Sequence, residues 1–437
     1  MKNRIKILLP AALFMYSIAA SAQTPQKISL QQAIDMSIKN SGKLAISSAK
    51  IIEATANVRE AEDRRLPDVK ATGSYLRLFG ANVDLKKQGN STGTGSAPKV
   101  NQALYGIVNA SYPIYTGGRI RYGIESAKYL EQAARLSADN DKEGITYNTI
   151  QAYTNLYKAG AMVAVVEEAR KASVQRDSLF SRLEQNGVLA RNDLLKAELQ
   201  TSNIELTLLD AQSNLTMANV NMDLILGLPE NTIIGIDSNF VNGKQELKSF
   251  PDMEALALQN RKDVQAVGFQ KKAADLGIKS AKAENYPSLA LTGGYIAADI
   301  PKVVTITNAV NIGIGVQYNL SSLWKTNTKL QQAKARATEL AATQSMMNDQ
   351  IKLELNRDYQ AYLLAQKKIE VYDKSVIQAT ENYRITKNKY DNSLVTITDL
   401  LDADVSLLQA RLSAAAARAD AALSYNKLLE TTGTLSK

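Results

Sequence analysis

The two halves of the sequence are similar to each other, and this internal duplication constrains the fold more than any other feature. A shift of about 206 positions brings the two halves into register. The clearest matches are 186–188 with 392–394, 193–195 with 399–401, and Gly227 with Gly433. Solenoid repeats are much shorter, at about 20–50 residues, so the period indicates a duplicated half. We predict a first structural repeat at 23–229, a linker at 230–251 and a second repeat at 252–437.

Both repeats have the same predicted order of elements: a helix, two strands, a very long helix, a short tip and a further helix. In the first repeat these are a helix at 30–65, strands at about 68–79 and 104–115, and helices at 119–185 and 193–226. In the second they are a helix at 253–285, strands at about 288–298 and 308–320, and helices at 325–390 and 399–430. Pro67 separates helix from strand because proline cannot continue a helix, and Gly227 closes the last helix of the first repeat. The loops 80–103 and 299–307 join the strands of each pair.

The helices carry the heptad spacing of coiled coils, with apolar residues at alternating steps of three and four. The first seam is Ile204, Leu208, Ala211, Leu215, Ala218, Met222 and Ile225, and the second is Leu401, Val405, Leu408, Leu412, Ala415, Ala419 and Ala422. One seam in an ordinary helical bundle accounts for this pattern taken alone. The length of the long helix in each repeat argues against an ordinary bundle. About 66 residues at about 1.5 Å each span about 100 Å, which is more than the diameter of a compact domain of this size. We therefore predict the wall of an elongated helical tube, with shorter helices stacked beside the long one.

Two of the extended stretches alternate between apolar and small or polar residues, which is the pattern of a strand with two different faces. From residue 308 onward the apolar face carries Val310, Ile312, Ile314, Val316, Tyr318 and Leu320. Strands of about ten residues with one apolar face suit a transmembrane barrel, although a soluble two-faced sheet gives the same alternation. Four strands cannot close a barrel, and lipid does not tolerate an open sheet edge. We therefore predict that chains share one barrel, with twelve strands from three chains favoured over eight from two.

The first 22 residues have the features of a secretory signal peptide. Lys2, Arg4 and Lys6 precede an apolar run at 7–20, and Ala-Ser-Ala at 20–22 fits a signal-peptidase site. The apolar run is shorter than the roughly 20 residues of a spanning helix, which argues against a membrane anchor. We expect an exported protein whose mature chain begins at Gln23.

The composition argues against several classes of function. The chain has no His and no Cys, so the usual zinc and copper ligands and the usual general base are missing. Lys and Arg exceed Asp and Glu by 52 to 43, but they are dispersed, as on a solvated surface, and do not form a nucleic-acid footprint. The sequence contains no phosphate-binding loop and no nucleophile elbow. We expect no cofactor, no nucleic-acid partner and no enzymatic activity.

Residues 390–403, Tyr-Asp-Asn-Ser-Leu-Val-Thr-Ile-Thr-Asp-Leu-Leu-Asp-Ala, resemble the tip segment of the TolC family of outer-membrane efflux proteins. The resemblance extends over the whole predicted mature chain. It implies a mainly α fold with β-structure: a homotrimer whose coiled-coil helices form a periplasmic α-barrel and whose strands, four per chain, form a shared twelve-stranded barrel in outer-membrane lipid.

The resemblance also implies a passive conduit, the channel component of a tripartite efflux or type I secretion system. Its partners would be a periplasmic adaptor protein and an inner-membrane pump of the RND, ABC or MFS type. The sequence leaves the cargo and the identity of the pump open. The alternative function is that of a periplasmic coiled-coil adaptor or a structural helical protein without a membrane barrel.

Near the tips the resemblance assigns roles to single residues. Asp399 and Asp402 match an acidic pair that lines the constricted periplasmic entrance, and Tyr390 matches a tyrosine that helps to hold it shut. Asn192 and Asp193 lie at the corresponding tip of the first repeat. Two further positions belong to the second tip. Thr396 is a tip contact, and Val395 stands where the family's best-known member has an arginine of the entrance-locking network.

The acidic pair can be interpreted in two ways. Asp399 and Asp402 are three positions apart and therefore share a helix face. Three copies would form two acidic rings, which attract cations at a pore entrance and favour partial protonation by mutual repulsion. Acids in a first helical turn also stabilise the helix dipole, with Thr396 and Thr398 as candidate caps. The residues alone leave both interpretations open.

Overall fold

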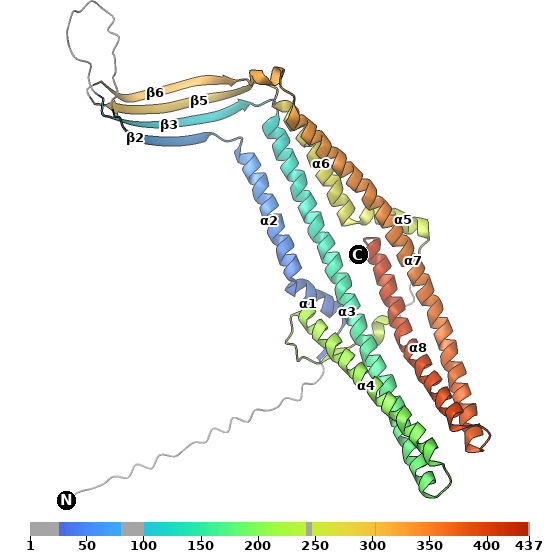
Figure 1. The fold of residues 1–437 in the computed structure, drawn as a ribbon. Coiled ribbons are helices and arrows are strands. Elements are labelled where there is room, and N and C mark those ends of the chain that lie inside the picture. The colour runs from blue at the N-terminus through green and yellow to red at the C-terminus, as the bar shows by residue number, and fades with distance from the viewer. Residues whose placement is uncertain (1–25, 80–99, 242–246, 302, 436–437) are drawn as a thin grey trace, which may run out of the picture. The chain divides into compact units, whose positions relative to one another are not determined.

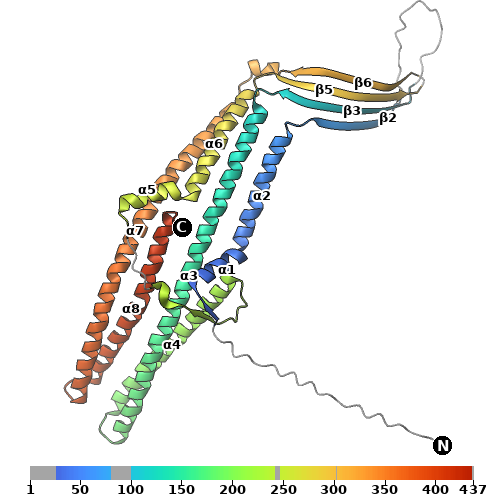
Figure 2. The ribbon, with the colours of Figure 1, turned by 180° about the vertical axis from the view of Figure 1, so that it is seen from behind.

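The computed structural model describes residues 26–79, 100–241, 247–301 and 303–435 (Figures 1 and 2). The predicted signal peptide at 1–22, most of the loop predicted at 80–103 and part of the linker predicted at 230–251 lie outside the described residues. The described chain forms two compact units. Unit 1 contains 26–40, 149–241 and 367–423, and unit 2 contains 41–79, 100–148, 247–301, 303–366 and 424–435.

Unit 1 is built mainly from long helices around a small parallel sheet. Its elements are β1 (Gln26–Ile28), α1 (Leu30–Asn40), the later part of α3 (Arg119–Gln185), α4 (Arg191–Leu226), β4 (Ile234–Ile236), η1 (Ser238–Val241), the end of α7 (Thr328–Asp391) and most of α8 (Ile397–Thr431). β1 pairs in parallel with β4. Tyr153 lies in the core beside this sheet, where its hydroxyl donates to the Ile28 carbonyl over 2.8 Å and its ring meets Phe240 edge-on at 5.2 Å. This core therefore joins segments that are far apart in the sequence.

Unit 2 combines the remaining helices with a four-stranded antiparallel sheet. Its elements are α2 (Gly42–Asp63), β2 (Asp68–Arg77), β3 (Gln102–Tyr115), the first part of α3, α5 (Phe250–Asn260), α6 (Lys262–Ala283), β5 (Ser288–Ile300), β6 (Val304–Gln317), η2 (Leu320–Leu323), the first part of α7 and the end of α8. The strands lie in the order β2-β3-β5-β6, as both views show (Figures 1 and 2). A buried cluster of Met253, Leu355 and Leu428 joins α5, α7 and α8.

The hydrogen-bond register gives the part of the sheet nearer the helices one apolar and one polar face, whereas further out the polar side carries the row Thr72, Ile107, Ile296 and Ala309. Residues paired across neighbouring strands share a face. Two rows on the apolar face are Ala71, Val108, Tyr295 and Val310, and Val69, Ala110, Gly293 and Ile312. Two rows on the polar face are Lys70, Asn109, Gly294 and Asn311, and Asp68, Ser111, Thr292 and Gly313. In a single chain the apolar face is open, because Val310 and Ile312 are 77% and 81% exposed.

The helices predicted at 30–65 and 253–285 are wrong in one respect, because each is broken into two. The first becomes α1 and α2, which meet at Ser41, and the second becomes α5 and α6, which meet at Arg261. Ser41 is extended (φ −70°, ψ 114°), and its hydroxyl accepts a hydrogen bond from the Leu44 backbone N–H, so it starts a new helix as an N-cap. Arg261 is likewise non-helical (φ −58°, ψ 123°), and its ion pairs with two carboxylates of unit 2 anchor the break.

Other predicted boundaries are shifted. β6 begins at Val304 and not near 308, because the strand continues through an irregularity at Asn308, whose φ is 58°. The helix predicted at 325–390 begins at Thr328, after η2, and those predicted from 193 and 399 begin at Arg191 and Ile397. β1 and β4 were not predicted, because three residues are too few to show a period. Within the described ranges, none of the helices combines the length and the apolar character needed to cross a membrane.

Gly117, just before α3, should not tolerate a side chain. Its φ is +64°, and a Cβ there would lie 2.8 Å from the Ala283 carbonyl oxygen and 3.0 Å from the Tyr286 Cβ. We expect Gly117→Ala to lower the free energy of unfolding by about 1–3 kcal/mol, measured by urea unfolding with far-UV circular dichroism. The control is Gly123→Ala inside α3, where a Cβ meets open space and stability should rise by up to about 1 kcal/mol. Equal midpoints for the two variants would contradict this expectation.

Candidate functional site

The two hairpin tips of unit 1 turn in the same way. One joins α3 to α4 through 186–190, and the other joins α7 to α8 through 392–396. Gly187 and Ser393 take the same place in these turns, with φ of 74° and 61°. In each tip a backbone N–H closes the preceding helix by donating to a carbonyl five residues earlier. These bonds run from Val188 to Leu183 at 2.9 Å and from Leu394 to Lys389 at 2.8 Å.

One apolar cluster joins the two tips. Its buried members are Phe180, Leu194 and Ala197 from the first hairpin and Ile397, Leu400 and Leu401 from the second. Tyr390 packs against this cluster, with its ring centroid 5.7 Å from that of Phe180. The structure therefore brings the predicted tip residues of both repeats into one region of unit 1.

Thr396 and Asp399 form a capping box at the start of α8. The Thr396 N–H and hydroxyl donate to the Asp399 carboxylate over 2.8 and 2.7 Å, and the Asp399 N–H donates to the Thr396 hydroxyl over 3.3 Å. These hydrogen bonds hold the pKa of Asp399 below its usual range. In a single chain Asp399 is therefore ionised at neutral pH. The mutual repulsion of three copies, which favours protonation, stays a prediction.

The other predicted tip residues have different surroundings. Asp402 is exposed, and among the described residues its carboxylate has no polar partner. Burial raises the pKa of Tyr390, and nearby carboxylates, Asp193 first, raise it further. Asp193 also forms an ion pair with Lys196 at 3.3 Å, whereas Asn192 is exposed in the first turn of α4. The structure thus brings Tyr390 close to Asp193.

Three ion pairs between α3 and α8 hold the two hairpins together, and the sequence reasoning missed them. They are Lys158–Asp420 at 2.6 Å, Glu168–Arg411 at 3.1 Å and Arg176–Asp404 at 2.7 Å. The Arg176 side chain is 9% exposed, and its Nε and Nη2 atoms have no partner among the described residues. The sequence does hold a signal for these pairs: as the residue number of the α3 partner rises, that of the α8 partner falls, as it must between antiparallel helices. It becomes visible only after α3 and α8 are known to be neighbours.

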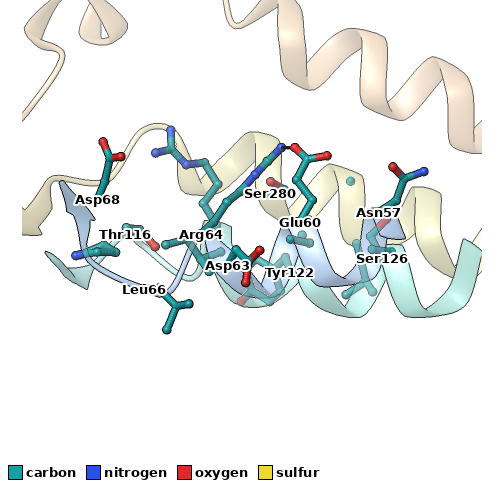
Figure 3. A pocket seen from close by; sticks show the side chains of 18 of the residues that line it. Asn57, Glu60, Asp63, Arg64, Leu66, Asp68, Thr116, Tyr122, Ser126 and Ser280 are labelled. Atoms are coloured by element: carbon teal, nitrogen blue, oxygen red, sulfur yellow. Dashed lines mark hydrogen bonds and ion pairs between the residues drawn. The ribbon is translucent and has the colours of Figure 1, made fainter. Parts of the chain in front are cut away.

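A polar groove of about 1190 Å³ lies in unit 2, where the polar face of the sheet meets the helices (Figure 3). Asp68 and Ser111 from the polar face line it. The helices contribute Glu60 and Asp63 from α2, Tyr122 and Ser126 from α3, and Ser280 from α6, and Arg64, which directly follows α2, also lines the groove. Arg64 pairs with Glu60 at 2.8 Å within the groove. A water-filled path along this side of the sheet would therefore meet polar side chains on the strands and on the helices.

Long helices paired at two hairpin tips, with an antiparallel sheet that is apolar on one face and polar on the other near the helices, are the arrangement expected for the subunit of a membrane channel. The described chain divides its α3, α7 and α8 helices between the unit with the tips and the unit with the sheet. No metabolic or hydrolytic site is needed to account for this arrangement.

The chain belongs to the outer membrane efflux protein family, whose sequence profile matches residues 33–228 and 255–434. It is 24% identical over 451 residues to the outer membrane protein TolC of Vibrio cholerae, covering 100% of this chain and 97% of that protein. It is 24% identical over 406 residues to the cation efflux system protein CusC of Escherichia coli O157:H7, covering 86% of this chain and 80% of that one. The crystal structure of the outer membrane protein VceC from Vibrio cholerae superposes with a TM-score of 0.78 at 20% identity, covering 92% of this chain and 96% of that one.

The chain is therefore an outer-membrane efflux channel protein with a periplasmic helical part. This confirms the predicted fold class, function and localisation. The family is one of transport components and not of enzymes.

Proposed function

We propose that three copies of this chain form one closed conduit, each contributing four strands to a shared barrel and its helices to a periplasmic tube. The register of the sheet is the observation that carries this proposal. In the rows through Val69 and Ala71 of β2, all four strands place apolar residues or glycine on the same face, and the strand order leaves β2 and β6 as the two edges. Edge strands expose unpaired backbone groups, which lipid does not tolerate, so each edge needs the edge of another chain.

The strand directions support closure by rotation. Successive strands are antiparallel in the order β2-β3-β5-β6, so β6 of one chain would run antiparallel to β2 of the next. Two chains would give eight strands, and side chains fill the interior of a barrel of that size. Three chains give twelve, which leaves room for a solute. A trimer is thus the smallest assembly that both seals the edges and conducts.

The conduit is passive, and its cargo is small toxic molecules delivered by an inner-membrane pump through a periplasmic adaptor. The names of the relatives support this, since they describe efflux of cations, of toluene and of antibiotics. Such varied cargo in one family indicates that the pump selects the solute. Both tips present an apolar side chain to solvent at equivalent positions, Val188 at 73% and Leu394 at 71% exposure, and these suit an adaptor contact.

The tips form the periplasmic entrance in this proposal. Asp399 and Asp402 lie one turn apart on α8 and contribute two acidic rings, while Tyr390, Asn192, Asp193 and Thr396 make the contacts between neighbouring tips. Asp399 has a second role, because it caps α8 through Thr396. Asp402 is the better residue to test, since its carboxylate has no polar partner among the described residues that a substitution would disrupt.

We expect Asp402→Asn to lower the cation-over-anion permeability ratio by about twofold to fivefold in planar bilayers. A ring charge a few Å from a passing ion contributes on the order of 1 kcal/mol in water, which is about a fivefold change. The measurement is the reversal potential across a salt gradient, made on protein whose chain number has been fixed by native mass spectrometry in detergent. Three chains are expected there.

Asp210→Asn is the matched control, because it removes the same charge from an exposed position on α4, 17 residues beyond Asp193. Its permeability ratio should equal that of the unmodified protein. Equal effects of both substitutions, or none from Asp402→Asn, would remove Asp402 from the entrance. A monomer that stays soluble without detergent would overturn the conduit itself.

A further inference from the structure

We propose that unit 2 carries a binding site for the phosphate group of an anionic phospholipid, in a cavity between β3 and the first turns of α3. The cavity has a volume of about 670 Å³. Its walls combine aromatic, aliphatic and cationic side chains: Arg65, Tyr112, Tyr115, Arg121, Ile124 and Lys128. The site goes beyond the proposed conduit, because it concerns the outer surface of the protein and not the path of the solute.

The apolar wall of the cavity continues the apolar face of the sheet. Tyr112 pairs with Leu291 and Tyr115 pairs with Leu289 on the neighbouring strand β5. Those two leucines pair in turn with apolar residues of β6. Acyl chains that cover this face would therefore reach the cavity without crossing a polar surface. Tyrosines at this boundary fit the interfacial aromatic girdle of outer-membrane proteins.

This cavity and the polar groove adjoin at Pro113, Thr116 and Ile120, but they lie mainly on different faces of α3. Arg121, Ile124 and Lys128 share one face of the helix, as positions three, four or seven apart must. Tyr122 and Ser126 lie on another face and line the polar groove of Figure 3. The phosphate site therefore lies on the side of α3 that adjoins the apolar sheet face.

Three cationic side chains, against one carboxylate, Glu125, in the cavity wall, give the cavity its charge preference. Arg121 pairs with Glu125 at 3.1 Å and Lys128 pairs with Glu62 at 2.9 Å, and both are exposed pairs that contribute little. Arg65 has no ion pair among the described residues. Arg65 could thus bind a phosphate directly, and Arg121 could bind it while keeping its contact with Glu125. Neither step would break a buried interaction. Arginine binds phosphate oxygens in a bidentate manner, and its stem extends along apolar surface while the guanidinium stays in water.

The position of the cavity along the sheet favours a phospholipid as the ligand. The cavity lies at the end of β3 that leads into α3, and the helices are periplasmic, so this end of the sheet meets the headgroups of the periplasmic leaflet. Basic side chains at such a boundary attract anionic headgroups. The chemistry on the two walls, phosphate on one and acyl chain on the other, is present together in an anionic glycerophospholipid and not in a free anion.

The test compares two double substitutions that change the charge equally on opposite sides of α3. Arg65→Gln with Arg121→Gln removes the phosphate ligands, and Arg64→Gln with Arg119→Gln removes their sequence neighbours, which line the polar groove. Each double variant also loses one exposed ion pair, Arg121–Glu125 or Arg64–Glu60. Native mass spectrometry of the detergent-purified oligomer measures binding of added phosphatidylglycerol, phosphatidylethanolamine or inorganic phosphate.

The unmodified protein should bind phosphatidylglycerol about tenfold more tightly than phosphatidylethanolamine, and Arg65→Gln with Arg121→Gln should abolish that preference. The Arg64 and Arg119 variant should retain it within about twofold. Equal losses in both double variants would reduce the effect to net charge and overturn the site. Binding of inorganic phosphate with the same dependence on Arg65 and Arg121, but without a preference for lipid, would also overturn it, in favour of a free-anion site. Thermal midpoints of the variants within a few degrees of the unmodified protein exclude misfolding as the cause.

Discussion

Replacing Arg261 by alanine is expected to lower the free energy of unfolding by about 3–5 kcal/mol, because it removes the cation paired with Asp263 and one of the cations paired with Glu354 in a partly buried site. The Arg261 side chain is 18% exposed. It holds Asp263 with two hydrogen bonds, at 2.7 and 3.1 Å, and Glu354 with one, at 3.0 Å. These contacts fix the chain at the break between α5 and α6 and join it to α7.

The pKa values of the group agree with this role. Burial alone would lower the pKa of Arg261, but its hydrogen bonds and charge contacts with Asp263 and Glu354 raise it. Burial pushes the pKa of Glu354 upward, but the hydrogen bond from Arg261 and the charge of Lys427 hold it below its usual value. A carboxylate with a lowered pKa stabilises the fold above its unfolded pKa, and this contribution is lost as the pH falls through the folded pKa. The difference between Arg261→Ala and the unmodified protein should therefore be full at pH 7 and shrink below about pH 4.

Urea unfolding in detergent, followed by far-UV circular dichroism at pH 7 and below about pH 4, measures the loss of unfolding free energy in Arg261→Ala. Arg384→Ala is the control, because its ion pair with Glu381 is exposed on both sides and contributes little to stability. A loss for Arg261→Ala no larger than that of Arg384→Ala would show that the cluster is a surface network. A loss that stays constant down to acid pH would show that packing, and not charge, makes the contribution.

The sequence revealed what depends on local periodicity. Alternation in residues 310–316 predicted the apolar face of β6, since a period of two follows from strand geometry alone. The heptads predicted long helices, since their spacing follows from helix geometry alone. The fold class could therefore be reached before any contact was known.

What the sequence did not reveal depends on contacts between distant residues. The break at Arg261 has no glycine, proline or capping side chain, and one of its ion pairs joins residues 93 positions apart. The break at Ser41 did have a local signal in Asn40-Ser41-Gly42, a turn sequence that the helical pattern on either side concealed. The tip between α7 and α8 likewise has one feature with a local sequence signal and one that depends on a distant residue. A threonine three residues before an acid is a capping box by sequence, but only the structure places Tyr390 beside Phe180 of the other hairpin.

Substituting arginine at Ile312 should prevent assembly in the outer membrane, whereas arginine at the adjacent Asn311 should be tolerated. Ile312 lies in the middle of β6 on the apolar face and pairs with Gly293. Asn311 lies on the polar face and pairs with Gly294, so each substitution faces a residue without a side chain. Arginine in contact with the hydrocarbon core costs about 2–4 kcal/mol, and the cost recurs in every copy of the oligomer.

The amount of assembled oligomer in outer-membrane fractions measures this difference, and the export of a toxic dye by the same cells measures function. Ile312→Arg should reduce the oligomer by at least about tenfold, because 1.4 kcal/mol per chain already gives that factor. Asn311→Arg should leave the amount near that of the unmodified protein and change only ion permeability, since its charge would point into water. The strength of the comparison lies in the matched positions, because the two variants have the same charge, the same strand and a glycine opposite. If Asn311→Arg were the variant excluded from the membrane, lipid would contact the polar face and the proposed barrel would be inside out. If both assembled equally, the sheet would not be in contact with lipid at this depth.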